Sequence, residues 1–244
     1  MRTVSIAFSA AISLFVFASP ALAADIPTKA PPPAATQAYN WTGLYAGGTF
    51  GGVFGHSEHC DPPYVFCTAP FDIAGIAGGP TLGYNWQATI GLPVMPNWVY
   101  GLETDFSWSR ATGGTGSIPG VYGCGGGCFT NVDWFGTVRG RVGPSFNNWF
   151  PYFTGGLVYA RISPGIAAAI LGEDSAIAVK TDWTIGGGIE YAIPGSARWS
   201  VKLEYLYFPM HNIFYDNAHV CGGLDCTAVL NQFNVLRLGA NYRF

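Results

Sequence analysis

The sequence is poor in charged residues. Asp, Glu, Lys and Arg make up 10% of its 244 residues, whereas soluble domains usually contain about 25%. The chain has 11 basic and 14 acidic residues, so it lacks the basic excess of a nucleic-acid-binding protein. Much of its surface is therefore expected to face something other than water, and no nucleic-acid partner is expected.

Long apolar runs are also scarce. After the first 23 residues no segment reaches 18 apolar residues, which excludes membrane-spanning helices. The start of the chain predicts a signal peptide, because Arg2 precedes an apolar stretch and the cleavage motif Ala21-Leu22-Ala23. A membrane anchor is the alternative, but the stretch is short and no basic stop-transfer residues follow it. We expect a signal peptide at 1–23, a Pro/Ala-rich periplasmic lead-in at 24–40 and a single domain at 41–244.

What the sequence does contain is a series of strand-like segments. There are eight of them, at 41–53, 74–87, 97–109, 130–145, 150–163, 179–193, 198–208 and 229–244. Short connections alternate with long ones, as in the barrels of bacterial outer membranes. The pattern predicts an all-β fold, an eight-stranded antiparallel transmembrane β-barrel with short periplasmic turns and long extracellular loops. It is expected in the cell outer membrane, surrounded by outer-membrane lipids.

The last segment alternates most clearly. From Leu236 to Phe244 apolar residues occupy every even position, and Arg237 and Arg243 occupy odd ones. One face suits lipid and the other suits a polar interior. Tyr242 and the terminal Phe244 look like the signal that the outer-membrane assembly machinery reads, so that machinery is an expected partner.

Charged residues in five segments share the face opposite the apolar residues. A charge on the lipid side would cost about 2–4 kcal/mol at mid-bilayer. We therefore place eleven charged residues in the lumen: Glu103, Asp105, Asp133, Arg139, Arg141, Asp182, Glu190, Lys202, Glu204, Arg237 and Arg243. Because both signs are nearly balanced, they are expected to form an ion-pair network that fills the lumen. Catalytic carboxylates, a metal site and a narrow gated ion path are the alternatives.

Aromatic residues fall at both ends of the segments. Rings with an apolar body and a polar tip prefer the headgroup level, so they predict two girdles. The periplasmic girdle would contain Trp41, Trp86, Trp98, Trp149, Tyr191, Trp199 and Tyr242, and the outer girdle Trp108, Trp134, Trp183 and Tyr207. The alternative is the core of a soluble sandwich.

Six cysteines form three close pairs in the long loops. The pairs are Cys60/Cys67, Cys124/Cys128 and Cys221/Cys226. An exported chain meets an oxidising compartment, so local disulfides are expected among the 15 arrangements that six cysteines allow. Zinc binding is the alternative, but no histidine or third cysteine accompanies Cys124 and Cys128.

All four histidines fall in the first and fourth long loops. They are His56, His59, His211 and His219. These loops are neighbours, because the last strand must close against the first. Solvated loop histidines are the simple interpretation, and a surface site for haem or a divalent metal is the sharper hypothesis.

Several short segments together carry a family resemblance. They are Asp25-Ile26-Pro27, residues 41–48, 83–87, 101–107, 136–143 and 154–157, and the Tyr-Arg-Phe end. In combination they resemble the small alphaproteobacterial outer-membrane surface-antigen family of porin-like barrels. The resemblance implies an OmpA-type eight-stranded barrel with surface-exposed loops, but no single activity, because relatives are described as structural antigens, adhesins and haem binders. The three cysteine-bearing loops depart from the family pattern, so loop functions are not carried over. A separate C-terminal peptidoglycan-binding domain, as some OmpA-type proteins carry, is not expected from this sequence.

We expect a non-enzymatic integral outer-membrane protein, without a cofactor, that contributes to envelope structure and presents surface loops. A small porin or a haem-binding receptor for a surface ligand is the alternative. A lipid-modifying barrel enzyme is a third class. It would need a Ser/His pair near the outer rim, and no serine lies near His211 or His219 in the sequence.

Overall fold

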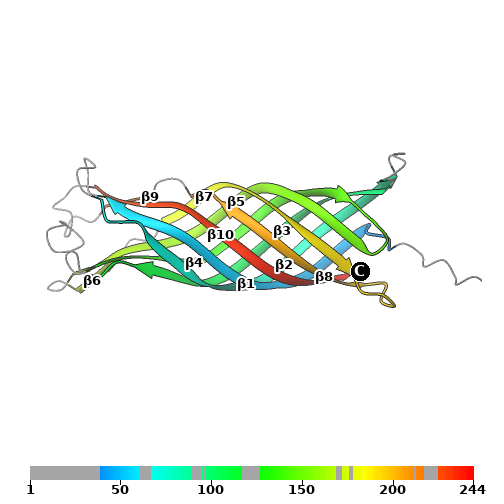
Figure 1. The fold of residues 1–244 in the computed structure, drawn as a ribbon, viewed down its shortest axis with the longest axis horizontal. Coiled ribbons are helices and arrows are strands. Elements are labelled where there is room, and N and C mark those ends of the chain that lie inside the picture. The colour runs from blue at the N-terminus through cyan, green and yellow to red at the C-terminus, as the bar shows by residue number, and fades with distance from the viewer. Residues whose placement is uncertain are drawn as a thin grey trace, which may run out of the picture. The chain divides into compact units, whose positions relative to one another are not determined.

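Period-two alternation produces long, tilted antiparallel strands (Figure 1). The computed structural model describes residues 39–60, 67–89, 95, 97–116, 127–168, 172–175, 178–210, 213–216 and 225–244. The strands are β1 (Gly43–Cys60), β2 (Phe71–Thr89), β3 (Asn97–Gly114), β4 (Cys128–Pro144), β5 (Trp149–Ala168), β6 (Gly172–Ser175), β7 (Ala178–Ala192), β8 (Trp199–Phe208), β9 (Ile213–Asp216) and β10 (Asp225–Arg243). Within these residues no helix is long and apolar enough to cross a membrane.

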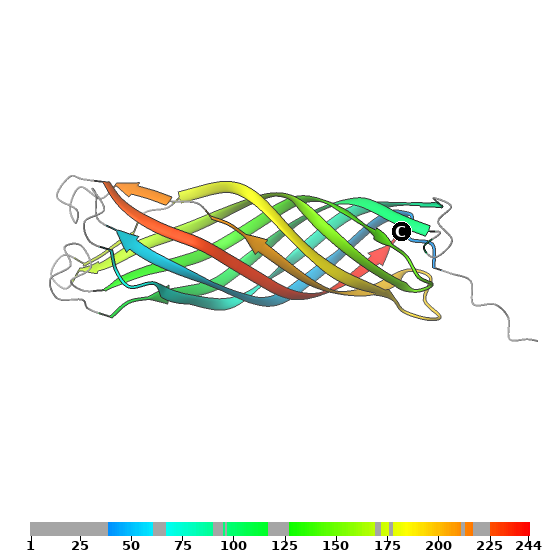
Figure 2. The same ribbon diagram turned by 45° about the horizontal axis from the view of Figure 1, so that its top comes forward.

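Eight of the strands close into a barrel. Their order is β1-β2-β3-β4-β5-β7-β8-β10, and β10 pairs with β1 from Tyr45↔Arg243 to Cys60↔Thr227. Figure 2 shows β10 lying beside β1 along the barrel. The short strands β6 and β9 pair only with β5 and β10. The predicted fold class, an eight-stranded antiparallel barrel, is confirmed.

The strands extend further than the sequence pattern predicted. β1 continues to Cys60 and β3 to Gly114, past the expected ends at residues 53 and 109. The backbone ladders continue there although the clean contrast between an apolar and a polar face is lost. The alternation therefore predicted the membrane-crossing part of each strand rather than its full paired length.

The two ends of the barrel are connected differently. At the short-turn end, predicted to face the periplasm, Asn147 and Gly195 adopt positive φ angles of 51° and 80° in tight turns. Asn148 Nδ2 also donates a hydrogen bond to Ala192 O (3.0 Å), which joins two neighbouring turns. The opposite end, called the long-loop end below, carries the longer connections.

The outer wall of the barrel is apolar. Its exposed large side chains include Phe153 (78%), Leu238 (65%), Trp108 (63%) and Phe50 (62%). Most girdle aromatics lie on this wall. Three ring pairs at the short-turn end are Trp149–Tyr191, Trp86–Tyr100 and Trp199–Tyr242.

Trp41 is an exception, and its assignment to the girdle was wrong. Only 2% of it is exposed, and its ring packs 5.3 Å from Phe150 inside the barrel. Its backbone N–H donates to Gln87 Oε1 (2.8 Å). Trp41 shares the odd-numbered phase of the inward-facing Tyr45 and Thr49 of β1, so continued alternation directs its ring into the barrel.

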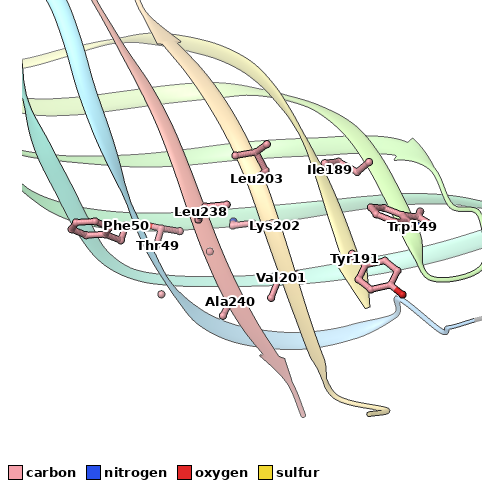
Figure 3. Close-up of a pocket in the computed structure, with 12 residues that line it drawn as sticks. Thr49, Phe50, Trp149, Ile189, Tyr191, Val201, Lys202, Leu203, Leu238 and Ala240 are labelled. Carbon is pink, nitrogen blue, oxygen red and sulfur yellow. The ribbon is translucent and has the colours of Figure 1, made fainter. Parts of the chain in front are cut away.

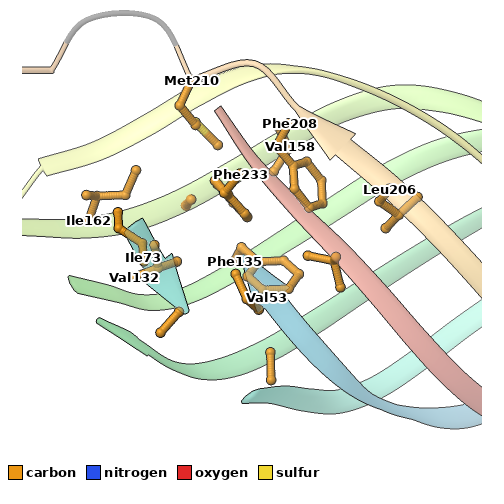
Figure 4. Packing of buried hydrophobic residues seen from close by; sticks show 14 of the residues in the cluster. Val53, Ile73, Val132, Phe135, Val158, Ile162, Leu206, Phe208, Met210 and Phe233 are labelled. Carbon is orange, nitrogen blue, oxygen red and sulfur yellow. The ribbon is translucent and has the colours of Figure 1, made fainter. Parts of the chain in front are cut away.

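The barrel interior is filled in three layers. At the short-turn end is an aromatic cluster, which contains Trp41, Val99, Phe150, Tyr152 and Ala192. The middle layer is an ion network of eight buried charged residues. Toward the long-loop end is an apolar cluster, which contains Val53, Phe71, Ile73, Ala77, Ala111, Val132, Phe135, Val158, Ala160, Ile162, Leu206, Phe208, Met210, Phe233 and Val235 (Figure 4).

Candidate functional site

The ion network consists of four acids and four bases, so its formal charges balance. They are Glu103, Asp105, Glu190 and Glu204 with Arg139, Arg141, Lys202 and Arg237, and each is at most 3% exposed. Charges removed from water are tolerated only when they are paired and hydrogen-bonded. The geometry of the network meets this requirement through three linked groups.

Glu103 of β3 forms the first group. Its carboxylate accepts hydrogen bonds from Lys202 Nζ (2.7 and 2.8 Å) and from Arg139 Nη2 (2.7 Å). Tyr45 Oη of β1 donates a further hydrogen bond to the same carboxylate (2.8 Å). Lys202 lies on β8, so this group ties opposite sides of the barrel together.

Asp105 and Glu204 form the second group by sharing two arginines. Arg237 Nη2 lies 2.8 Å from Asp105 Oδ2 and 2.7 Å from Glu204 Oε2. Arg139 lies 3.0 Å from each of the same two carboxylates. Thr137 Oγ1 and Tyr152 Oη donate further hydrogen bonds to Asp105 and Glu204.

Glu190 and Arg141 form the third group, next to the aromatic cluster. Arg141 Nη1 lies 2.9 Å from Glu190 Oε2. The same guanidinium lies 4.6 Å from the ring centroid of Tyr45 and 5.2 Å from that of Phe150, within cation–π range. Arg141 therefore connects the ion network with the aromatic cluster.

Register and alternation explain why these side chains meet. Glu103 lies directly opposite Arg139, and Arg237 lies directly opposite Glu204. Lys202 reaches across the lumen because its register partner on β10 is Gly239. A Cβ at Gly239 would lie 3.0 Å from the Lys202 side chain, so the glycine leaves the space that the lysine crosses.

Three of the eleven residues expected in the lumen lie outside this network. Asp133 was assigned to the wrong face, because the β4–β5 register shifts between Val132 and Trp134. A bulge places one extra residue in a strand and changes which positions share a face. Asp133 instead pairs with Arg161 on the wall, with 38% of both side chains exposed.

Asp182 and Arg243 keep the inward alternation but are not part of the network. Asp182 is partly exposed and accepts a hydrogen bond from the backbone N–H of Trp183. Arg243 lies at the short-turn end, where its guanidinium stacks 4.4 Å from the Tyr39 ring. Its Nη2 donates to Ala197 O at 2.8 Å.

Sequence reasoning missed the neutral members of the network. They are Tyr45, Asn85, Thr137, Tyr152, Thr154, Ser200 and Asn241. With them, all eight barrel strands contribute a side chain to the network. Their inward alternation was a usable signal, but charge alone was used to choose lumenal residues.

The apolar cluster was also missed. Phe208 and Phe233 lie 4.6 Å apart between ring centroids, Phe135 lies within 6 Å of both, and all three are fully buried. Phe135 and Phe208 each follow a wall aromatic, Trp134 and Tyr207, so at these positions alternation does not separate wall from interior. The cluster fills the lumen between the ion network and the long-loop end.

Of the four histidines in the predicted site, two lie within the described residues. These two side chains point to opposite sides of β1. His56 is exposed on the wall, with Nδ1 2.7 Å from Asp72 Oδ1. His59 points inward, is 4% exposed, and has Nε2 2.9 Å from Thr130 Oγ1. Placing His59 at a surface site was wrong, because three positions along a strand reverse the direction of a side chain. His211 and His219 lie outside the described residues.

His59 lies above the aromatic girdle, next to the Cys60–Cys67 disulfide. Burial lowers the pKa of its imidazole to about 4, so the ring is neutral at physiological pH. Among the described residues, no group of three His, Cys, Asp or Glu side chains could hold a metal ion.

The cysteines are described in part. Cys60 and Cys67 form a disulfide that joins the last residue of β1 to the segment before β2. Cys128 is disulfide-bonded as well. Cys124, Cys221 and the side chain of Cys226 lie outside the described residues, as do the predicted signal peptide and the lead-in up to residue 38.

The wall carries a hollow of about 690 Å³ across β1, β10, β8 and β7 (Figure 3). Gly48, Val201 and Ala240 line it together with larger apolar and aromatic side chains. Lys202 also lines it, but its amine turns inward to Glu103. Within the part of the chain that the structure describes, no histidine, serine, cysteine or carboxylate lines this hollow, and its mostly apolar lining suits hydrocarbon.

The predicted assembly signal lies at the end of β10. Phe244 is 70% exposed, and its ring contacts that of Tyr242 edge-on at 5.4 Å. Arg198 Nη1 donates to Tyr242 Oη (2.6 Å), which holds the penultimate aromatic against the neighbouring turn.

Comparisons with known proteins agree with this architecture. The profile of the family described as "Outer membrane protein beta-barrel domain" matches residues 9–244. A 31 kDa outer-membrane immunogenic protein of Brucella melitensis biotype 1 is 34% identical over the full length of both chains. A 22 kDa outer membrane protein of Rhizobium leguminosarum bv. viciae is 29% identical over 72% of this chain and 68% of its own. The crystal structure of OprG from Pseudomonas aeruginosa shares the fold, with a TM-score of 0.52 and 11% identity over 85% of this chain and 98% of its own.

Proposed function

The chain belongs to the outer membrane protein β-barrel domain family, and we propose that it is a structural, non-enzymatic member that presents its long connections at the cell surface. Like its relatives, it is an outer-membrane protein. The long-loop end then faces outward and the short-turn end faces the periplasm.

The filling of the interior supports a structural role. The central charges are paired with one another and receive hydrogen bonds from neutral donors, and the apolar cluster covers them toward the long-loop end. A conduit for solutes would need a continuous polar path, and the apolar cluster interrupts one. The network carboxylates are buried and already paired, which also argues against general acid–base catalysis.

Envelope integrity in a deletion strain tests this role. Loss of the protein is expected to increase sensitivity to SDS and EDTA, and the wild-type gene should restore resistance. A variant with residues 117–123 replaced by a short Gly-Ser linker, which keeps Cys124 and its expected partner Cys128, should restore resistance equally but alter recognition of the cell surface by antibodies. A deletion strain as resistant as its parent would refute the structural role.

The porin and haem-receptor alternatives predict different phenotypes. A porin would make the deletion strain take up small hydrophilic solutes more slowly. A haem receptor would show haem binding that is lost when His56, His59, His211 and His219 are all replaced by alanine. We expect neither effect, because the lumen is filled and His56 and His59 point to opposite sides of β1.

The assembly machinery is the expected partner of the C-terminal strand. Phe244→Ala should slow the appearance of folded barrel in cells without changing the stability of barrel that has folded. Phe244 is exposed on the wall, so its removal leaves the interior intact. Pulse-labelling followed by heat-modifiable gel mobility measures both quantities.

A further inference from the structure

Two arginines lie on the outer wall of the barrel, near the long-loop end. Arg110 of β3 is exposed, two residues beyond Trp108. Arg161 of β5 lies opposite Trp134 in the β4–β5 register, and Trp134 lies opposite Trp108. Both guanidiniums therefore lie at the outer aromatic girdle, the level at which lipid headgroups begin.

These arginines are incompletely paired within the described residues. Arg161 Nε lies 3.3 Å from Asp133 Oδ2 but forms no hydrogen bond with it. The Asp133 carboxylate instead accepts a hydrogen bond from Ser163 Oγ (2.6 Å). Arg110 has no ion pair with any described residue. One carboxylate thus faces two guanidiniums, and the surface keeps an excess positive charge. Asp72, the next acid on the wall, pairs with His56.

A hollow with both apolar and polar lining residues lies beside Arg110. Its volume is about 620 Å³, and Phe50, Ile76, Gly78 and Trp108 line it, with Arg110 and Asp133 also in its lining. Gly78 lies between Phe50 and Trp108 in the strand registers. The Phe50 ring leans over this glycine, because its Cδ2 would lie 3.2 Å from a Cβ added there. The hollow that remains is a trough bordered by the two large rings. A trough suits a hydrocarbon chain, and a guanidinium at its rim suits an anion.

We propose that Arg110 and Arg161 bind the anionic headgroup of a glycolipid of the outer leaflet. Its phosphate or carboxylate groups contact the guanidiniums, which present paired donors that match such anions. Its sugar rings lie against Trp108 and Trp134, and an acyl chain occupies the trough bordered by Phe50 and Trp108. A glycolipid fits better than a phospholipid, because the rings of Trp108 and Trp134 lie between the two arginines and offer sugar rings a surface to stack on. The proposal rests on the orientation given under the proposed function.

Native mass spectrometry of the full-length folded barrel, released from micelles containing EDTA, tests this surface. The probes are bis-phosphorylated lipid A, phosphatidylglycerol and phosphatidylcholine. Wild type should retain lipid A in preference to both phospholipids. Arg110→Gln/Arg161→Gln should weaken retention on the order of tenfold or more, since each lost bond is charge-assisted. Arg198→Gln is the matched control, because this exposed arginine lies on a turn at the opposite end, and its retention should equal that of wild type.

Three results would overturn the proposal. They are equal retention of lipid A by wild type and the double variant, equal retention of lipid A and phosphatidylcholine by wild type, and equal retention of lipid A and phosphatidylglycerol. Heat-modifiable mobility of each variant establishes that it is folded. A folded, non-conducting barrel that fails to retain lipid A would contradict this inference but leave the structural role standing.

Discussion

The ion network and the apolar cluster fill the same barrel by different chemistry. In the network, Glu204 lies between two arginines, and every partner fixes the geometry of the others. In the apolar cluster, Leu206 is only two residues away on the same strand, and shape alone defines its contacts. A single strand can therefore contribute first to a layer held by paired charges and then to a layer held by packing. The two layers should respond differently to substitutions that conserve shape.

The largest effect is expected in the ion network. Glu204→Ala leaves Arg139 and Arg237 without one of their counter-charges, which should lower the free energy of unfolding by about 3–5 kcal/mol. Urea unfolding in lipid vesicles, followed by gel mobility, measures the loss. The control is Asp133→Asn on the wall, where a partly exposed pair should contribute about 1 kcal/mol or less. Similar losses for both variants would show that burial does not strengthen the network.

A somewhat smaller effect is expected in the apolar cluster. Leu206→Ala should lower the free energy of unfolding by about 2–4 kcal/mol, because it creates a cavity in a fully buried site. Leu206→Met conserves volume and should cost less than about 1.5 kcal/mol. Glu204→Gln also conserves shape, yet it should remain strongly destabilising because it removes the charge. If Gln is tolerated at 204 as well as Met is at 206, the distinction between the layers fails.

Space inside the barrel gives the third prediction. Gly239→Val should displace Lys202 from its path to Glu103 and cost about 1–3 kcal/mol in unfolding free energy. Gly48→Val is its control on the wall, where the nearest contact of an added Cβ is 3.8 Å from Gly79 O. We expect near-wild-type stability for the control. A Gly239→Val barrel as stable as wild type would show that Lys202 can reach Glu103 without the space at Gly239.

The smallest effect concerns His59, above the apolar cluster. Its folded-state pKa of about 4 lies below the unfolded value near 6.5, so the unfolded chain binds the proton first as pH falls. His59 should therefore reduce stability progressively from about pH 6.5 to about pH 4, by about 1–2 kcal/mol at pH 5. The difference in unfolding free energy between wild type and His59→Gln, measured at each pH, isolates this contribution. A pH-independent difference would contradict a buried neutral imidazole.

The sequence predicted the closed barrel and the charged part of its ion network. Alternation works where one face meets lipid and the other meets charge, as at Glu103 and Arg237. It fails at Asp133, because a bulge changes the face, and at Phe135 or Phe208, because both faces are apolar there. Cross-lumen contacts such as Lys202 to Glu103 depend on barrel closure and on Gly239, which no local pattern contains.

Single-channel recording in planar bilayers tests most directly whether the two layers seal the barrel. Folded wild-type protein, verified by heat-modifiable mobility, should produce no stepwise current above that of the bare bilayer. Reproducible steps of uniform size would show a continuous path through both layers and would contradict a filled, structural barrel.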